Sequence, residues 1–244
     1  MIGLKEDQGI VTLSLDRADK RNAMSPELID ALNGALEEVA LRETMRVLIL
    51  AGEGSCFCAG LDLQGILDNP PATTDLLRGL SVAMRQIRRL PVPTIARVQG
   101  AAIGGGCGLM VVSDFAFTHP EAKVGYPEVD LGVCPAVVSP WLMRKIGPSR
   151  TRAMLLAGGT MSGEQGFAAG LATHLVDLEG LADATINFAK ELARGDRHAL
   201  TVTKAWLNRL DHSDDDAMLD LAADLSAEVI MSNEAQARLR KIRG

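Results

Sequence analysis

Two glycine-rich segments, each placed after an expected strand, constrain the fold of this chain most. The first, 52–60, directly follows the apolar run 46–51, and the second contains the glycine triplet 104–106. Glycine lets the backbone turn tightly and expose its N–H groups. A helix that begins at such a turn directs unpaired N–H groups and the positive end of its dipole outward. Ligands sit at the carboxyl ends of strands in open α/β sheets, so both segments are predicted to face one crevice that suits an anion or a developing oxyanion. Two ordinary tight turns remain the alternative.

The hydrophobic pattern predicts strand–helix units followed by a helical tail. Alternating or short continuous apolar runs predict strands at 10–15, 46–51, 94–98 and 115–118. Helices are expected at 25–42, 73–90 and from Gly105 onward, and then at 140–146, 149–157, 162–169, 181–193, 200–210 and 214–243. Such units favour an α/β fold with a mostly parallel sheet. We predict a core over 1–195 and a C-terminal helical region over 196–244, with no linker between them.

Composition excludes several classes of function. The formal net charge is −6 and the isoelectric point is near 5.3, which argues against bulk nucleic-acid binding. No uncharged apolar run is long enough to cross a membrane. The N-terminus carries charges and no long apolar stretch, so no secretory signal is expected. The four cysteines are expected to be reduced, small buried hydrophobes in a cytoplasmic protein. Neither they nor the four scattered histidines form a metal-ligand pattern, and no dinucleotide fingerprint is present.

Four motifs, in this order and spacing, resemble the crotonase, or enoyl-CoA hydratase/isomerase, superfamily across essentially the whole chain. They are Arg17-Ala-Asp-Lys-Arg-Asn-Ala-Met-Ser25, Cys58-Ala-Gly-Leu-Asp-Leu63, Gly104-Gly-Gly-Cys-Gly108 and Pro127-Glu-Val-Asp-Leu-Gly132 followed by Pro135. The resemblance implies a spiral of ββα units with a C-terminal helical trimerisation region, assembled as a homotrimer or homohexamer. It implies an acyl-CoA thioester as substrate and no permanently bound cofactor.

The resemblance also assigns site residues. The backbone N–H groups of Leu61 and Gly105 are expected to bind the thioester oxygen, and Glu128 is expected to move the proton. Contacts to CoA are expected from the basic pair Lys20 and Arg21 and from the loop residues Ala59 and Asp62.

The chain departs from typical hydratases of the family at one position. Those enzymes hold water between two glutamates, and the position of the first is Gly108 here. Residues 105 and 108 are one helical turn apart and share a face, so Glu128 is left as the only strong acid/base candidate. A carboxylate in an apolar pocket has a raised pKa, which suits proton transfer near neutral pH.

Three interpretations of Glu128 follow. The first is an enoyl-CoA hydratase, resembling bacterial methylglutaconyl- and γ-carboxygeranoyl-CoA hydratases that pair glycine at the first site with a similar run from Glu128 to Pro140. The second is a single-carboxylate Δ3-Δ2 enoyl-CoA isomerase. The third is an acyl-CoA binder without catalysis. Position 108 alone does not decide among them.

Three further features carry expectations of their own. Tyr126, Trp141 and Met143 are expected either in the acyl pocket or in the core. Asp130 is a spare carboxylate for which an exposed turn is expected. The basic stretch from Arg238 to Arg243 is where the resemblance allows contact with a neighbour's CoA.

Overall fold

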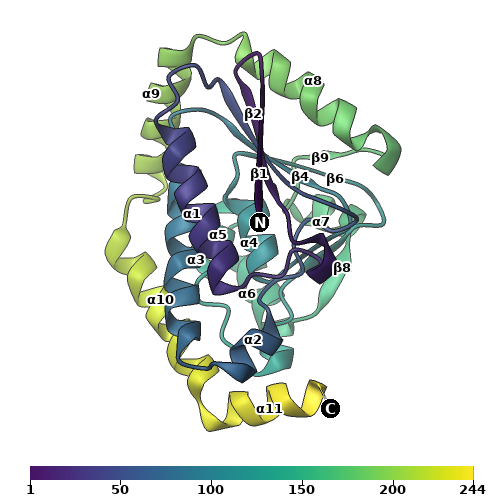
Figure 1. Ribbon diagram of the computed structural model, residues 1–244, viewed down its shortest axis with the longest axis vertical. Helices are drawn as coiled ribbons and strands as arrows, with labels where there is room; N and C mark the ends of the chain where they lie inside the picture. Colours follow the sequence, from purple (N-terminus) through teal and green to yellow (C-terminus); the bar gives the residue numbers. More distant parts are fainter. Residues whose placement is uncertain (244) are drawn as a thin grey trace.

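A six-stranded sheet forms the centre of the protein. The computed structural model describes the backbone of residues 1–243 and the side-chain surroundings of residues 1–241. The strand order is β1-β2-β3-β4-β6-β9 (Figure 1). The strands are β1 (Ile2–Asp7), β2 (Ile10–Leu15), β3 (Val47–Gly52), β4 (Thr94–Val98), β6 (Phe115–Thr118) and β9 (His174–Leu175). Only the β1–β2 pair is antiparallel, and the other neighbouring pairs are parallel. The predicted α/β fold with a mostly parallel sheet is confirmed.

Helices cover both faces of this sheet, which explains why β3 is apolar at every position. Leu48 and Leu50 join the large apolar core formed with α1 (Pro26–Ala40) and α3 (Ala72–Arg89). Val47 and Ile49 point the other way and join a smaller cluster with α8 (Leu181–Ala193). Successive residues of a strand face opposite sides, so a strand buried on both faces needs a continuous apolar run.

The start of α1 follows the predicted cap. The Ser25 hydroxyl oxygen accepts a hydrogen bond from the Leu28 N–H at 3.3 Å, and Pro26 occupies the first helical position. The helix ends at Ala40, two residues before the predicted end at 42.

A second, three-stranded sheet lies beside the first and was not predicted. It consists of β5 (Ala101–Ile103), β7 (Lys123–Gly125) and β8 (Thr160–Ser162), in the order β5-β7-β8. Strand β5 runs directly into the helix α4 (Gly105–Val112), which is buried along its whole length. The small sheet therefore fixes where the glycine triplet begins its helix.

The C-terminal region is helical, and part of it packs on the core of the same chain. It comprises α9 (Arg197–Leu210), α10 (Asp216–Met231) and α11 (Asn233–Arg243), so the single segment expected at 214–243 is interrupted at Ser232. Helix α10 lies along α3 (Figure 1). Ion pairs at 2.8 Å join Arg78 to Asp224 and Arg85 to Asp220 across this contact.

The remaining helices are short and complete the connections. They are η1 (Ala18–Lys20), α2 (Leu63–Asp68), η2 (Val129–Leu131), α5 (Ser139–Ile146), α6 (Pro148–Ala157), α7 (Gly163–Ala169) and η3 (Leu178–Gly180). Within residues 1–243, no helix combines the length and the apolar character needed to cross a membrane.

Candidate active site

The glycine triplet forms a turn and the first residues of α4. Gly104 has φ +55° and ψ −121°, a conformation that favours glycine, and its N–H donates to the Gly125 carbonyl at 2.8 Å. A Cβ on Gly106 would lie 2.5 Å from the Cys58 carbonyl oxygen, so this residue must also be small. Gly105 occupies the first helical position, and its N–H has no acceptor among residues 1–243. A free donor therefore points out of the helix start.

The loop carrying Leu61 lies directly beside this turn. Cys58 pairs with Ala102 of β5, and a Cβ on Gly60 would lie 2.9 Å from the Ile103 carbonyl oxygen. The Leu61 N–H, like that of Gly105, finds no acceptor in the part of the chain that the structure describes. The two predicted donors are thus brought to one place by the contact between the 58–61 loop and β5.

Glu128 lies against the same turn. A Cβ on Gly104 would lie 2.8 Å from Glu128 Oε1, so the carboxylate packs directly against this turn. The other oxygen, Oε2, is buried and has no hydrogen-bond partner within the described residues. Burial raises the pKa of Glu128 from 4.5 to about 7. A carboxyl group with this pKa is available in both protonation states near neutral pH.

Two small cavities meet at these residues. One, of about 60 Å³, is lined by Ala59, Gly60, Leu61, Leu63, Ile103, Gly104, Gly105, Pro127, Glu128, Leu131, Val133 and Ile230. The other, of about 20 Å³, is lined by Leu61, Leu77, Leu80, Gly105, Glu128, Val133, Cys134, Pro135, Val137, Val138 and Ser226. Both contain Leu61, Gly105 and Glu128, and we call the larger one the Glu128 cavity. The structure therefore brings together the three residues that the sequence selected for catalysis.

Burial of Glu128 is expected to make the stability of the fold depend on pH. The folded-state pKa is raised to about 7, so the folded protein keeps a proton that the unfolded chain loses near pH 4.5. The stabilisation from this proton is fully present below the unfolded pKa and is lost as pH rises toward about 7. In Glu128→Gln the side chain is neutral throughout. As the pH rises from about 5 to about 8, the Tm of the wild type is therefore expected to fall relative to the Tm of Glu128→Gln. Thermal unfolding at the two pH values measures this change. An equal Tm difference between the two proteins at both pH values would contradict the effect.

Position 108 lies in an apolar wall. A Cβ on Gly108 would lie 2.3 Å from Met84 Cε and 2.7 Å from Val138 Cγ1. Met84 and Val138 are both buried. A side chain at position 108 would therefore overlap these two residues from its first atom onward. Glu128 is the only carboxylate among the residues that line the two cavities.

The predicted CoA-contacting residues lie at the edge of the site. Lys20 and Arg21 are exposed, and the Arg21 carbonyl accepts a hydrogen bond from the Ala59 N–H at 3.1 Å. Ala59 itself lines the Glu128 cavity. Asp62 caps α2 through the Gly65 N–H at 3.3 Å and pairs with Arg17 at 2.8 Å. Its carboxylate therefore shapes the loop, and a contact of Asp62 with CoA stays a prediction.

Two residues that hold these loops together were not singled out from the sequence. The Asn22 side chain is fully buried and donates to the carbonyl oxygens of Glu53 and Cys56 at 3.0 and 2.7 Å. Arg17 donates to the Ala23 carbonyl at 2.9 Å while pairing with Asp62. Both belong to the Arg17–Ser25 motif, but Glu53, Cys56 and Asp62 are distant in sequence, so spacing gives no signal for these contacts.

The residues with two interpretations are now placed. Tyr126 and Trp141 are buried in the core, and Met143 is about half exposed. None of the three lines either cavity that contains Glu128. Asp130 is exposed, as expected, and accepts from the Gly159 N–H at 2.7 Å. Arg238 donates to the Asp130 carbonyl at 2.7 Å within the same chain, while the Arg243 side chain and Gly244 lie outside the described residues.

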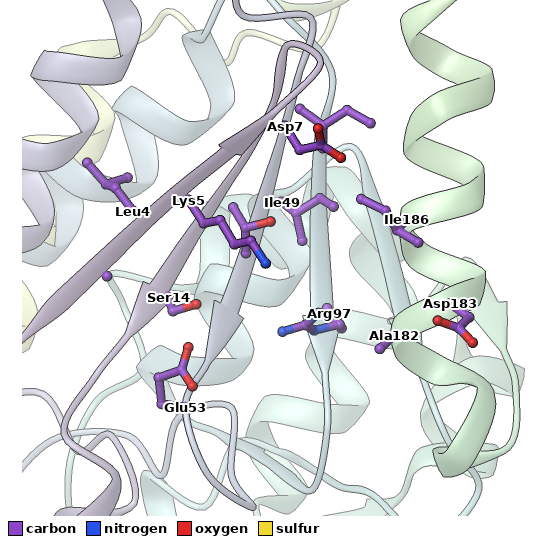
Figure 2. Close-up of a pocket in the computed structure, with 13 residues that line it drawn as sticks. Leu4, Lys5, Asp7, Ser14, Ile49, Glu53, Arg97, Ala182, Asp183 and Ile186 are labelled. Atoms are coloured by element: carbon purple, nitrogen blue, oxygen red, sulfur yellow. The ribbon is translucent and has the colours of Figure 1, made fainter.

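A larger groove, of about 450 Å³, lies elsewhere, where β1–β4 meet α8 (Figure 2). Figure 2 shows Lys5 and Arg97 extending into it from β1 and β4. It contains none of the residues selected from the motifs. The Glu128 cavity is therefore the candidate active site.

Comparison with known protein families supports the same assignment as the site geometry. The sequence model of the enoyl-CoA hydratase/isomerase family matches residues 5–241. The chain belongs to this family. The crotonase resemblance inferred from the four motifs is thereby confirmed, and the chain is an enzyme of the hydratase/isomerase type.

Three known proteins illustrate the relationship. The chain is 32% identical over 225 residues to 1,2-epoxyphenylacetyl-CoA isomerase of Escherichia coli, covering 89% of this chain and 86% of that protein. It is 31% identical over 193 residues to mitochondrial methylglutaconyl-CoA hydratase of Homo sapiens, covering 78% of this chain and 57% of the relative. The structure of an enoyl-CoA hydratase from Bacillus halodurans matches with a TM-score of 0.92 at 22% identity, covering 98% and 99% of the two chains. The last comparison confirms the crotonase fold.

Proposed function

We propose that the enzyme adds water to a 2-enoyl-CoA, with Glu128 as its single acid/base group. The observation that carries the proposal is the half-buried Glu128 side chain, with a buried, unpartnered Oε2 and a pKa of about 7, beside two free backbone donors. The similarity to a methylglutaconyl-CoA hydratase supports hydration.

In the proposed reaction the two donors bind the thioester oxygen, and Glu128 acts first as a base and then as an acid. The thioester oxygen accepts hydrogen bonds from the Leu61 and Gly105 N–H groups, which stabilise negative charge as it develops on that oxygen. Ionised Glu128 takes a proton from water while the water oxygen forms a bond to the β-carbon. The same carboxyl then gives that proton to the α-carbon, which restores the carboxylate. These steps need only the chain, water and the CoA thioester, so the proposal includes no permanently bound cofactor.

Isomerisation is the second candidate, and the wall at Gly108 favours it. A water molecule in a protein interior needs about two to four polar partners, whereas Met84 and Val138 present apolar atoms there. A single carboxylate is sufficient to remove an α-proton from a 3-enoyl-CoA and return it to the γ-carbon.

Mass spectrometry in deuterated water distinguishes the two reactions. We expect the purified enzyme to convert a 2-enoyl-CoA or 3-methylglutaconyl-CoA into a product heavier by one water, and Glu128→Gln to abolish this. Double-bond migration or deuterium exchange without gain of water would show that the enzyme is an isomerase and not a hydratase. Binding of 2-enoyl, 3-enoyl and 3-methylglutaconyl thioesters of CoA without any chemical change would overturn both hydration and isomerisation and leave Glu128 without a catalytic role.

We further propose that Lys20 and Arg21 bind the CoA phosphates, because both are exposed cations and Arg21 contacts Ala59 of the Glu128 cavity. The cytoplasmic location stays a prediction.

A homotrimer or homohexamer is also part of the proposal. The helix α9 exposes Val202, Trp206, Leu207 and Leu210, each by more than half. Adjacent apolar side chains of this size are typical of protein interfaces. Light scattering is expected to give the mass of three or six chains, and Trp206→Glu is expected to lower it. A wild-type monomer would refute the assembly.

A further inference from the structure

Helix α10 contributes side chains to both cavities beside Glu128. Ile230 lines the Glu128 cavity and Ser226 lines the smaller neighbour. Both residues are almost completely buried. They are four positions apart and therefore lie on one face of the helix. A segment that the sequence assigned to the C-terminal helical region thus forms part of the candidate active site.

The Ser226 hydroxyl connects this helix to the segment that follows Glu128. Its oxygen accepts a hydrogen bond from the Val137 N–H at 3.1 Å, and it donates to the Cys134 carbonyl at 3.0 Å. Cys134 and Val137 are themselves part of the smaller cavity's wall. One side chain therefore fixes the separation between α10 and the 134–137 segment.

Helix α10 is also held by α3. Besides the two ion pairs across this contact, the Ser81 hydroxyl donates to the Leu219 carbonyl at 3.4 Å. The Ser226 hydrogen bonds to the 134–137 segment and the contacts with α3 together define the position of this helix. Because Ile230 is one helical turn beyond Ser226, the position of the helix also determines the position of the Ile230 side chain.

The Glu128 cavity is small because of its apolar wall. Its aliphatic lining comes from Leu61, Leu63, Ile103, Leu131, Val133 and Ile230. All but Ile230 belong to segments between residues 58 and 135, which also carry the acid/base group and the two donors. Shortening Ile230 therefore enlarges the cavity without altering the loops that hold those groups.

We propose that Ile230 limits the size of the acyl group accepted beside Glu128, and that Ser226 is the positioning residue that holds Ile230 in place. This inference rests on the proposed function, in which the cavity receives the acyl part of a CoA thioester. One methylene group in a hydrophobic pocket changes discrimination by about 10–200-fold. Ile230→Ala is expected to raise the preference for a longer acyl chain by at least about tenfold.

Binding measurements test this without any turnover. The Glu128→Gln protein is titrated calorimetrically with butyryl-CoA and octanoyl-CoA, alone and combined with Ile230→Ala or the milder Ile230→Val. The ratio of the two Kd values is expected to shift toward octanoyl-CoA, more for alanine than for valine. Leu221→Ala is the matched control, because it removes an exposed aliphatic side chain from the same helix.

Ser226 variants separate positioning from general stability. Ser226→Ala is expected to shift the Kd ratio in the same direction as Ile230→Ala, whereas Ser226→Thr keeps the hydroxyl and is expected to retain the original ratio. An unchanged ratio in folded Ile230→Ala or Ile230→Val protein would overturn the inference while leaving the proposed function intact. Failure of the Glu128→Gln protein to bind either acyl-CoA would overturn both.

Discussion

Glu128→Gln is expected to lower kcat by roughly 10²–10⁴-fold and to leave acyl-CoA binding nearly unchanged. Glutamine keeps the shape of the side chain but neither accepts nor donates a proton at neutral pH. The two backbone donors, from Leu61 and Gly105, are unaffected. Steady-state kinetics with the substrate found by mass spectrometry gives kcat, and calorimetry with a saturated acyl-CoA gives Kd.

Asp130→Asn is the matched control for this substitution. It makes the same carboxylate-to-amide change two residues away, on a side chain that is exposed and bonded to the Gly159 N–H. Its kcat is expected to stay close to that of the wild type. Equal losses in both variants would mean that the region responds to any lost carboxylate, and the assignment of the proton transfer to Glu128 would then be wrong.

Much of the fold was predictable because its signals are local. The Ser25-Pro26 pair marks the start of α1 through a cap and a fixed φ, and both act within one helical turn. The continuous apolar run of β3 reports burial on both faces. By contrast, β5, β7 and β8 have three residues each, which is too short for a period to be visible. The break at Ser232 has no glycine or proline to mark it.

The residues of the candidate site also fall into two groups, those that the sequence predicted and those that it did not. Leu61, Gly105 and Glu128 each stand in a motif, so the resemblance placed them together and the structure does so too. Ile230 and Ser226 stand in no motif, and their partners lie about a hundred residues earlier in the chain. The apolar pattern of α10 predicts only that one face of the helix is buried. The pattern is the same whether that face covers a solid core or the wall of a cavity.

Gly108→Glu is expected to destabilise the protein rather than create a two-glutamate hydratase. The first atom of the new side chain already overlaps Met84 Cε, at 2.3 Å, and Val138 Cγ1, at 2.7 Å. Overpacking of a core costs about 1–3 kcal/mol in the free energy of unfolding. A second carboxylate among these apolar atoms adds a further cost because it has no partner there. Hydration activity is therefore expected to fall, not rise.

Urea unfolding of a small series tests the steric part of this argument. Gly108→Ala is expected to show most of the overpacking cost, since the overlap begins at Cβ. Combining Gly108→Glu with Met84→Ala removes the nearer obstacle and is expected to recover part of the lost stability. If Gly108→Glu alone unfolds at the wild-type urea concentration, Met84 and Val138 move aside freely. The single-carboxylate site would then depend on the identity of residue 108 and not on the wall that surrounds it.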